Sequence, residues 1–134
     1  MNKYTKNINR IEFVITNSCT GKCKHCSQGE HVSNEHIDSE LAVQAVHDIC
    51  NDYKIDSLMT FDGEPLLYPE TVLEIHSAAK ECGIKYRELI TNGYFSKKID
   101  RIQQVAEMLA KSGTNIIKLS VDSFHQETIP LEIV

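Results

Sequence analysis

Apolar and β-branched residues gather in four short runs along the chain, and these runs predict four β-strands. They cover residues 11–16, 55–61, 84–91 and 115–121. Short runs rich in isoleucine, valine, leucine, threonine and aromatic residues are typical of strands buried in a sheet. The chain is therefore organised around four predicted strands that are separated by longer segments.

Each segment between these runs carries apolar residues on one helical face, which predicts three helices. Asp38 is a candidate N-cap for the first helix, and Pro69 suits the first turn of the second. Gly83 and Gly113 are placed to end the second and third helices. The apolar faces consist of Ala42, Val46, Ile49 and Tyr53, then Val72, Ile75, Ala79 and Cys82, then Ile102, Val105, Ala106 and Leu109.

The alternation of strands and helices predicts an α/β fold with a parallel sheet and right-handed crossovers. About four strands and three crossover helices make up the whole inventory, whereas a complete eightfold β/α barrel needs roughly 250 residues. The chain has 134 residues and shows no internal linker. We therefore expect one domain over residues 1–134, built as a half-barrel or a small open sheet.

Composition narrows the class of protein further. Hydrophobic residues make up 41% and charged residues 25%, as in an ordinary soluble globular protein, and the formal charge of −5 argues against a nucleic-acid partner. The apolar stretches are too short to cross a bilayer, so no membrane partner is expected. Residues 1–10 have no apolar core behind their positive side chains, which predicts no signal peptide and a cytoplasmic location.

Three of the five cysteines are crowded together after the first predicted strand. Cys19, Cys23 and Cys26 have the spacing Cys-x3-Cys-x2-Cys, whereas the other two lie on helical apolar faces and are expected to be core thiols. Disulfides are rare in the cytosol, so the cluster of three indicates a metal centre. Soft thiolates favour an iron–sulfur cluster or zinc. A four-iron cluster held here would keep one iron without a cysteine.

A structural zinc site is the alternative interpretation of the same cysteines. In that case a histidine would provide the fourth ligand, and the candidates are His25, His31 and His36.

Polar motifs also follow the other predicted strands, at residues 62–65, 91–93 and 120–122. Parallel α/β folds bind ligands at the carboxyl ends of their strands, so these motifs predict a shared site. Each motif also has a purely structural interpretation. Residues 62–65 and 91–93 contain turn-forming residues, and Asp122 can cap the next element. His125, just past the fourth strand, is placed to face a substrate.

The cysteine triplet after a first strand resembles the signature of the radical S-adenosylmethionine (radical SAM) superfamily. Asp62-Gly63-Glu64-Pro65 resembles the Gly-Gly-Glu-Pro motif of that family, with Asp62 in place of the first glycine. The segment from Ser120 to Asp122 resembles its fourth-strand, ribose-contacting segment. The resemblance extends from about Ile11 to the last residue.

The resemblance implies a definite chemistry. The three cysteines of the family bind three irons of a [4Fe–4S] cluster, and S-adenosyl-L-methionine chelates the fourth through its amino and carboxylate groups. An electron from the reduced cluster then cleaves the carbon–sulfur bond, and the 5′-deoxyadenosyl radical abstracts hydrogen from a substrate. A flavodoxin- or ferredoxin-type electron donor is implied as a partner.

The family's residue roles carry over to matching positions of this sequence. Cys19, Cys23 and Cys26 would be the cluster ligands. The segment Asp62-Gly63-Glu64 would hold the methionine amino group, and Ser120 or Asp122 would contact the ribose or the carboxylate. His25 precedes the third cysteine, where the family often has an aromatic residue near the adenine.

The family's core usually has six β/α units, whereas this sequence predicts four strands. We therefore expect a truncated radical SAM domain with its cluster loop at residues 17–37, or a half-barrel completed by self-association. The apolar fourth strand would form an exposed edge that favours pairing with another chain. Two other classes stay open: an interaction module with structural zinc, and a non-catalytic remnant that binds a cluster without positioning S-adenosylmethionine.

Overall fold

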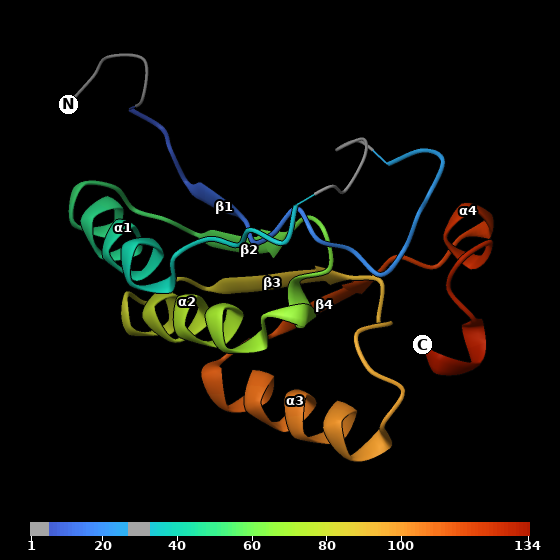
Figure 1. Cartoon of the computed structure of the whole chain (residues 1–134). Coiled ribbons are helices and arrows are strands. Elements are labelled where there is room, and N and C mark those ends of the chain that lie inside the picture. Colours follow the sequence, from blue (N-terminus) through green and yellow to red (C-terminus); the bar gives the residue numbers. More distant parts are fainter. Residues whose placement is uncertain (1–5, 27–32) are drawn as a thin grey trace.

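The structure is a computed structural model that describes residues 6–26 and 33–134. Its centre is a parallel sheet in the order β1-β2-β3-β4, so each strand pairs with the next one in the sequence (Figure 1). The strands are β1 (Arg10–Val14), β2 (Ser57–Phe61), β3 (Tyr86–Thr91) and β4 (Ile116–Leu119). Such stepwise order is that of a barrel wall, but the sheet stays open. This confirms the predicted partial β/α fold.

The apolar runs extend beyond the observed strands at one or both ends. At the end of the first run, Ile15 and Thr16 lie beyond β1. The Ile15 amide still donates to the Phe61 carbonyl of β2 at 2.9 Å, whereas Thr16 forms an isolated antiparallel bridge with His36. The last residues of this run thereby help to build the loop above the sheet.

Three helices cover one face of the sheet (Figure 1). They are α1 (Ser39–Asp52), α2 (Pro69–Glu81) and α3 (Ile99–Ser112), and short turns η1 (Pro65–Leu67), α4 (Ser123–Gln126) and η2 (Leu131–Ile133) complete the chain. The predicted helix ends are confirmed: Asp38 accepts a hydrogen bond from the Leu41 amide, and Gly113 ends α3 with φ of 94°. Within residues 6–26 and 33–134, none of the helices has the length and apolarity needed to cross a bilayer.

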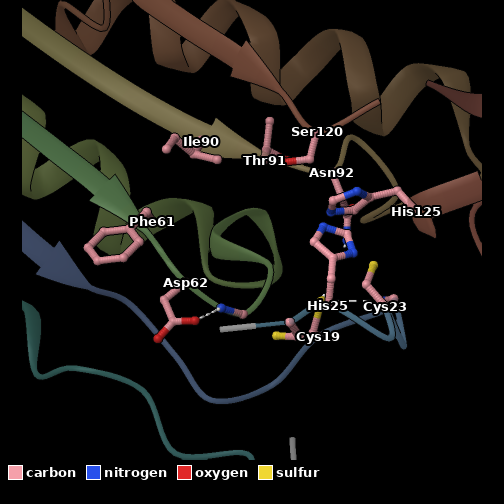
Figure 2. Close-up of a pocket in the computed structure, with 13 residues that line it drawn as sticks. Cys19, Cys23, His25, Phe61, Asp62, Ile90, Thr91, Asn92, Ser120 and His125 are labelled. Atoms are coloured by element: carbon pink, nitrogen blue, oxygen red, sulfur yellow. Dashed lines mark hydrogen bonds between the residues drawn. The ribbon is translucent and has the colours of Figure 1, made fainter. Parts of the chain in front are cut away.

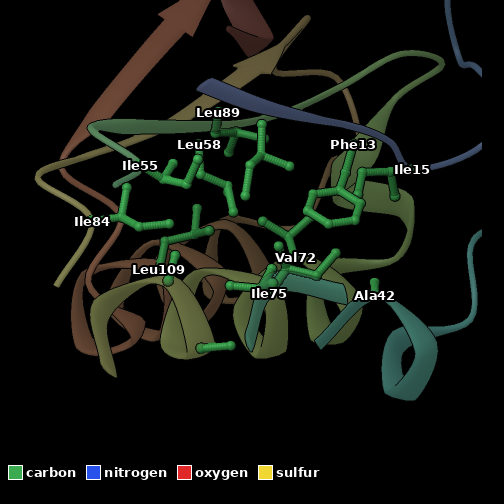
Figure 3. Close-up of a cluster of buried hydrophobic side chains, with 14 of the residues drawn as sticks. Phe13, Ile15, Ala42, Ile55, Leu58, Val72, Ile75, Ile84, Leu89 and Leu109 are labelled. Carbon is green, nitrogen blue, oxygen red and sulfur yellow. The ribbon is translucent and has the colours of Figure 1, made fainter. Parts of the chain in front are cut away.

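The hydrophobic core lies between the sheet and these helices (Figure 3). Alternate residues of the strands point to the helices, so Phe13 pairs in register with Thr60 and Thr60 with Leu89 on this face. Cys50 and Cys82 pack against the core but are only partly buried. Side chains at the centre of the core include Ile15, Val46, Leu58, Val72, Ile75, Ile84, Leu89 and Val105.

The opposite face of the sheet carries a charged group in place of a second helical layer. Glu88 of β3 accepts hydrogen bonds from Arg10 of β1 at 3.1 Å and from Lys118 of β4 at 2.6 Å. Hydrogen bonds from these two cations lower the pKa of Glu88 to about 2. The ion pairs therefore tie the first, third and fourth strands together on the side that none of the described helices covers.

His76 of α2 is a fully buried polar residue inside the core. Its Nε2 atom lies 3.0 Å from the Thr60 hydroxyl, and its Nδ1 atom lies 2.7 Å from the Thr114 hydroxyl. Burial lowers the pKa of His76 to about 4, helped by the nearby Arg87. The imidazole is therefore neutral in the folded chain, where it joins α2 to β2 and to the segment before β4.

Acidification is expected to destabilise the chain through His76. The folded state disfavours the protonated imidazole, so this stability is fully present above the ordinary pKa of 6.5 and is lost as the pH falls towards about 4. The difference between the two pKa values corresponds to a loss of about 3 kcal/mol in the free energy of unfolding. Urea unfolding at about pH 7.5 and about pH 4.5 should show a smaller pH dependence for His76→Gln than for wild type. His47→Gln, at a half-exposed histidine, is the matched control; equal pH dependence in all three chains would contradict this role.

Candidate functional site

A cavity of about 330 Å³ lies at the carboxyl ends of the strands, where loops from all four strands meet (Figure 2). The sheet order brings these loops to one edge because every strand runs in the same direction. Most residues predicted from the polar motifs line this cavity: Cys19, Cys23, His25, Cys26, Asp62, Gly63 and Ser120. Sequence motifs more than ninety residues apart thus share one site.

The three cysteines of the loop after β1 all line the cavity, and none of them is in a disulfide within the described part of the chain. The Sγ atom of Cys19 accepts a hydrogen bond from the Gly21 amide at 3.4 Å. Burial raises the pKa of Cys19, and the nearby Glu64, Cys23 and Cys26 add to the rise. Burial likewise raises the pKa of Cys23. Three soft donors converging on one cavity fit an iron–sulfur cluster, and binding would displace their protons.

The segment after β2 approaches the cysteine loop through its backbone. The Glu64 amide donates to the Ser18 carbonyl at 2.8 Å. Gly63 has φ of 57°, and a Cβ atom there would lie 2.3 Å from the Ser18 carbonyl oxygen and 2.5 Å from that of Thr16. Only glycine permits this approach, so the two loops meet at a fixed distance.

Asp62 lines the cavity next to Gly63. It adopts φ of 75°, unusual for a residue other than glycine, and its Oδ1 atom accepts a hydrogen bond from the Gly63 amide at 2.8 Å. Its Oδ2 atom is buried and has no hydrogen-bond partner within the described part of the chain. A buried oxygen without a hydrogen-bond partner is costly, so this carboxylate is a strained feature of the cavity wall.

Glu64, by contrast, is fully buried behind the cavity wall. Its Oε1 atom accepts hydrogen bonds from the Thr91 hydroxyl at 2.6 Å and the Leu66 amide at 3.0 Å, and its Oε2 atom accepts one from the Asn92 amide at 2.8 Å. Burial raises the pKa of Glu64, while these hydrogen bonds act in the opposite direction. The carboxylate therefore joins the loop after β2 to the loop after β3.

Ser120 and Asp122 take different positions at the end of β4. Ser120 lines the cavity, and its amide donates to the Thr91 carbonyl at 2.9 Å. Asp122 caps α4, accepting from the Phe124 and His125 amides, and its Oδ2 atom lies 2.9 Å from His125 Nδ1. These hydrogen bonds, above all those from His125, lower the pKa of Asp122. The capping interpretation of Asp122 is thus confirmed.

The segment that contains α4 packs against the cysteine loop. The His25 ring lies 4.9 Å from that of Phe124 and 5.0 Å from that of His125, measured between centroids. The Lys22 amide donates to the Thr128 hydroxyl at 3.2 Å, and Lys24 pairs with Glu127 at 3.2 Å. The end of the described chain therefore forms one side of the site.

The histidines proposed for a zinc site are spread apart. His36 stacks on Tyr68 with ring centroids 4.1 Å apart and does not line the cavity, whereas His25 does. His31 lies outside the described residues. Of the two described candidates, only His25 shares the cavity with the cysteines.

Asn92 belongs to the motif at residues 91–93, for which the sequence allows either a place in the shared site or a turn, without a role for this residue. It lines the cavity, and its side-chain amide donates to the Thr20 hydroxyl at 3.1 Å and to Cys19 Sγ at 3.6 Å. Phe61 at the end of β2 and Ile90 in β3 also line the cavity, although the sequence indicates only strand residues there. The sequence feature that points to Asn92 is the position of residues 91–93 at the same sheet edge as the other motifs.

Comparison with known proteins agrees with this geometry. The family model of the radical SAM superfamily matches residues 13–133. A GTP 3',8-cyclase from Alkaliphilus oremlandii (strain OhILAs) is 26% identical over 127 residues, which cover 92% of this chain and 38% of that protein. A probable GTP 3',8-cyclase from Methanocaldococcus jannaschii is 27% identical over 126 residues, 93% of this chain and 40% of that protein. The chain thus spans about two fifths of the length of these relatives.

A solved structure of a histidine-tagged protein, described as anSMEcpe with bound AdoMet, has a similar fold. Its TM-score is 0.54 at 15% sequence identity, over 81% of this chain and 42% of that one. The fold, the family match and the position of the cysteine loop after β1 agree with one another. The chain therefore belongs to the radical SAM superfamily.

Proposed function

We propose that the chain holds a [4Fe–4S] cluster on Cys19, Cys23 and Cys26 and binds S-adenosylmethionine beside it. One observation carries this proposal: the three thiols line the same cavity as Asp62, Gly63 and Ser120. When bound, the reduced cluster supplies the electron that cleaves S-adenosylmethionine to a 5′-deoxyadenosyl radical for hydrogen abstraction.

The residues around the cavity would each bind one part of the cofactor. Asp62 would accept hydrogen bonds from the methionine amino group, with Gly63 beside it and Glu64 fixing the segment from behind. Ser120 would contact the ribose or the carboxylate. Asp122 would contact the ribose or the carboxylate only through its Oδ2 atom, because its Oδ1 atom caps α4.

His25 lies on the opposite side of the cavity from Asp62 and would contact the adenine (Figure 2). Its ring already packs against Phe124 and His125, so an adenine base would extend an existing group of rings.

Anaerobic reconstitution with iron and sulfide, followed by electron paramagnetic resonance (EPR), tests this function. A reduced-cluster signal that changes when S-adenosylmethionine is added is the expected result. A signal unchanged by S-adenosylmethionine would indicate a non-catalytic cluster protein. Zinc in place of iron after anaerobic purification would indicate a structural metal module.

Replacing Asp62 by asparagine is expected to weaken S-adenosylmethionine binding at least about tenfold. The substitution keeps the size of the side chain but removes the negative charge that faces the amino group, and charge-assisted hydrogen bonds contribute about 1.5–3 kcal/mol. Titration of the EPR change with S-adenosylmethionine measures the affinity. Asp52→Asn, on the exposed end of α1, is the matched control; equal affinity in the two variants would refute the assignment.

We also propose two partners: a flavodoxin- or ferredoxin-type electron donor in the cytoplasm, and a second copy of the chain at the outer edge of β4. Within residues 6–26 and 33–134, no strand pairs with that edge, and the Ile117 and Leu119 side chains are 52% and 51% exposed.

Light scattering is expected to show a concentration-dependent dimer formed through this edge. Ile117→Lys should return the chain to a monomer, because a lysine on an edge strand opposes pairing. Leu131→Lys, at an exposed leucine elsewhere, should leave the dimer intact. A wild-type chain that stays monomeric at high concentration would contradict the proposal.

A further inference from the structure

Asn92 is a buried polar residue for which the proposed cofactor roles leave no function. It follows β3 directly and is 6% exposed. Its side-chain Nδ2 atom lies 3.6 Å from Cys19 Sγ and 3.1 Å from the Thr20 hydroxyl. The side-chain amide of Asn92 therefore donates both to Cys19, a candidate cluster ligand, and to Thr20, the next residue.

The backbone and side chain of Asn92 are held by other contacts. Its amide donates to Glu64 Oε2 at 2.8 Å, and its Oδ1 atom accepts from the Tyr94 amide at 2.8 Å. With the carbonyl oxygen of the side chain occupied by Tyr94, the Nδ2 atom must face the opposite way, towards Cys19 and Thr20. The orientation of the Asn92 side-chain amide is therefore fixed by its hydrogen bond with Tyr94 as well as by its contact with the sulfur.

Glu64 provides the anchor for this arrangement. Its other oxygen accepts from the Thr91 hydroxyl at 2.6 Å, so one buried carboxylate holds two successive residues at the end of β3. The Glu64 amide in turn donates to the Ser18 carbonyl, directly before Cys19. A closed set of hydrogen bonds thus connects Glu64, Asn92 and the first cysteine.

We propose that Asn92 is a positioning residue that donates a hydrogen bond to the sulfur of Cys19 and so raises the reduction potential of a bound cluster. This rests on the proposed function. Together with the Gly21 amide at 3.4 Å, Asn92 gives Cys19 two N–H donors. A reduced cluster carries more negative charge on its sulfurs, so an N–H donor stabilises the reduced form more than the oxidised form.

EPR-monitored redox titration of the reconstituted protein tests this role. Asn92→Leu and Asn92→Ser both lack the amide donor but differ in size and polarity. At a fixed ambient potential, each is expected to lower the ratio of reduced to oxidised cluster about fivefold, which corresponds to about 1 kcal/mol. A shift common to both variants identifies the lost donor, because their effects on packing differ. Asn51→Leu, on the exposed side of α1, is the matched control.

The outcomes separate this proposal from the proposed function. If wild type shows a cluster signal that responds to S-adenosylmethionine but both Asn92 variants keep the wild-type ratio, the role of Asn92 is refuted and the function stands. A wild-type chain that binds no cluster refutes both. If Asn92→Leu fails to fold, an unchanged ratio in Asn92→Ser alone overturns the proposal.

Discussion

Replacing Cys23 by alanine is expected to reduce bound iron from about four atoms per chain, the content of a [4Fe–4S] cluster, to background. Cys23 is one of three thiols on the cavity wall, and two remaining thiolates leave two of the four irons without a protein ligand. The reduced-cluster EPR signal, and any effect of S-adenosylmethionine on it, should disappear with the iron. Iron and sulfide analysis after anaerobic reconstitution provides the measurement.

Cys50→Ala is the control for this experiment. Cys50 is also a free cysteine, but it packs against the core on α1 and does not line the cavity. The variant should keep its iron with at most a modest loss of stability. Equal iron in wild type and Cys23→Ala would show that the cysteine triplet does not hold the cluster.

Gly63→Ala is expected to disrupt both folding and cofactor binding. The new Cβ atom would lie 2.3 Å and 2.5 Å from two backbone carbonyl oxygens, which cannot move aside as a flexible side chain would. A left-handed backbone adds a conformational cost of about 1–3 kcal/mol, so we expect the free energy of unfolding in urea to fall by about 3 kcal/mol or more. The cysteine loop would also shift away from Asp62, so the EPR response to S-adenosylmethionine should be lost.

Gly83→Ala is the control that separates the effect of the steric clash at residue 63 from the conformational cost of a left-handed backbone. Gly83 has φ of 76°, close to that of Gly63, but a Cβ atom there meets nothing within 4 Å. This variant should lose only about 1 kcal/mol and keep its response to S-adenosylmethionine. Similar losses in the two variants would mean that the loops can separate without consequence.

The fold was predictable because its elements are encoded locally. Apolar runs, helical stripes and single capping residues such as Asp38 and Gly113 each act over a few neighbouring positions. The parallel arrangement follows from their alternation. For α4 only the cap, Asp122, was predicted, since four residues are too few to show a helical pattern.

The sequence was sufficient to predict where the site lies in the fold, but not which side chains contact one another in it. Motifs at the carboxyl ends of strands must meet at one edge, which brought Asp62 and Ser120 to the cavity. The burial of Glu64 depends on the Thr91 hydroxyl and the Asn92 amide, 27 and 28 residues further along the chain. No local pattern records a hydrogen bond over such a separation, so the contacts of Glu64 and Asn92 could not be derived from spacing alone.

The packing of the cysteine loop against the α4 segment has a consequence for biosynthesis. Lys22 and Lys24 find their partners at Thr128 and Glu127, more than a hundred residues later in the sequence. At a ribosomal rate of roughly 5–20 residues per second, the three thiols emerge about 5–20 seconds before the wall that shields them. During that time they are open to oxidants and to stray metal ions. We therefore expect cluster insertion to follow synthesis of the α4 segment, and maturation to depend on how well the nascent thiols are protected.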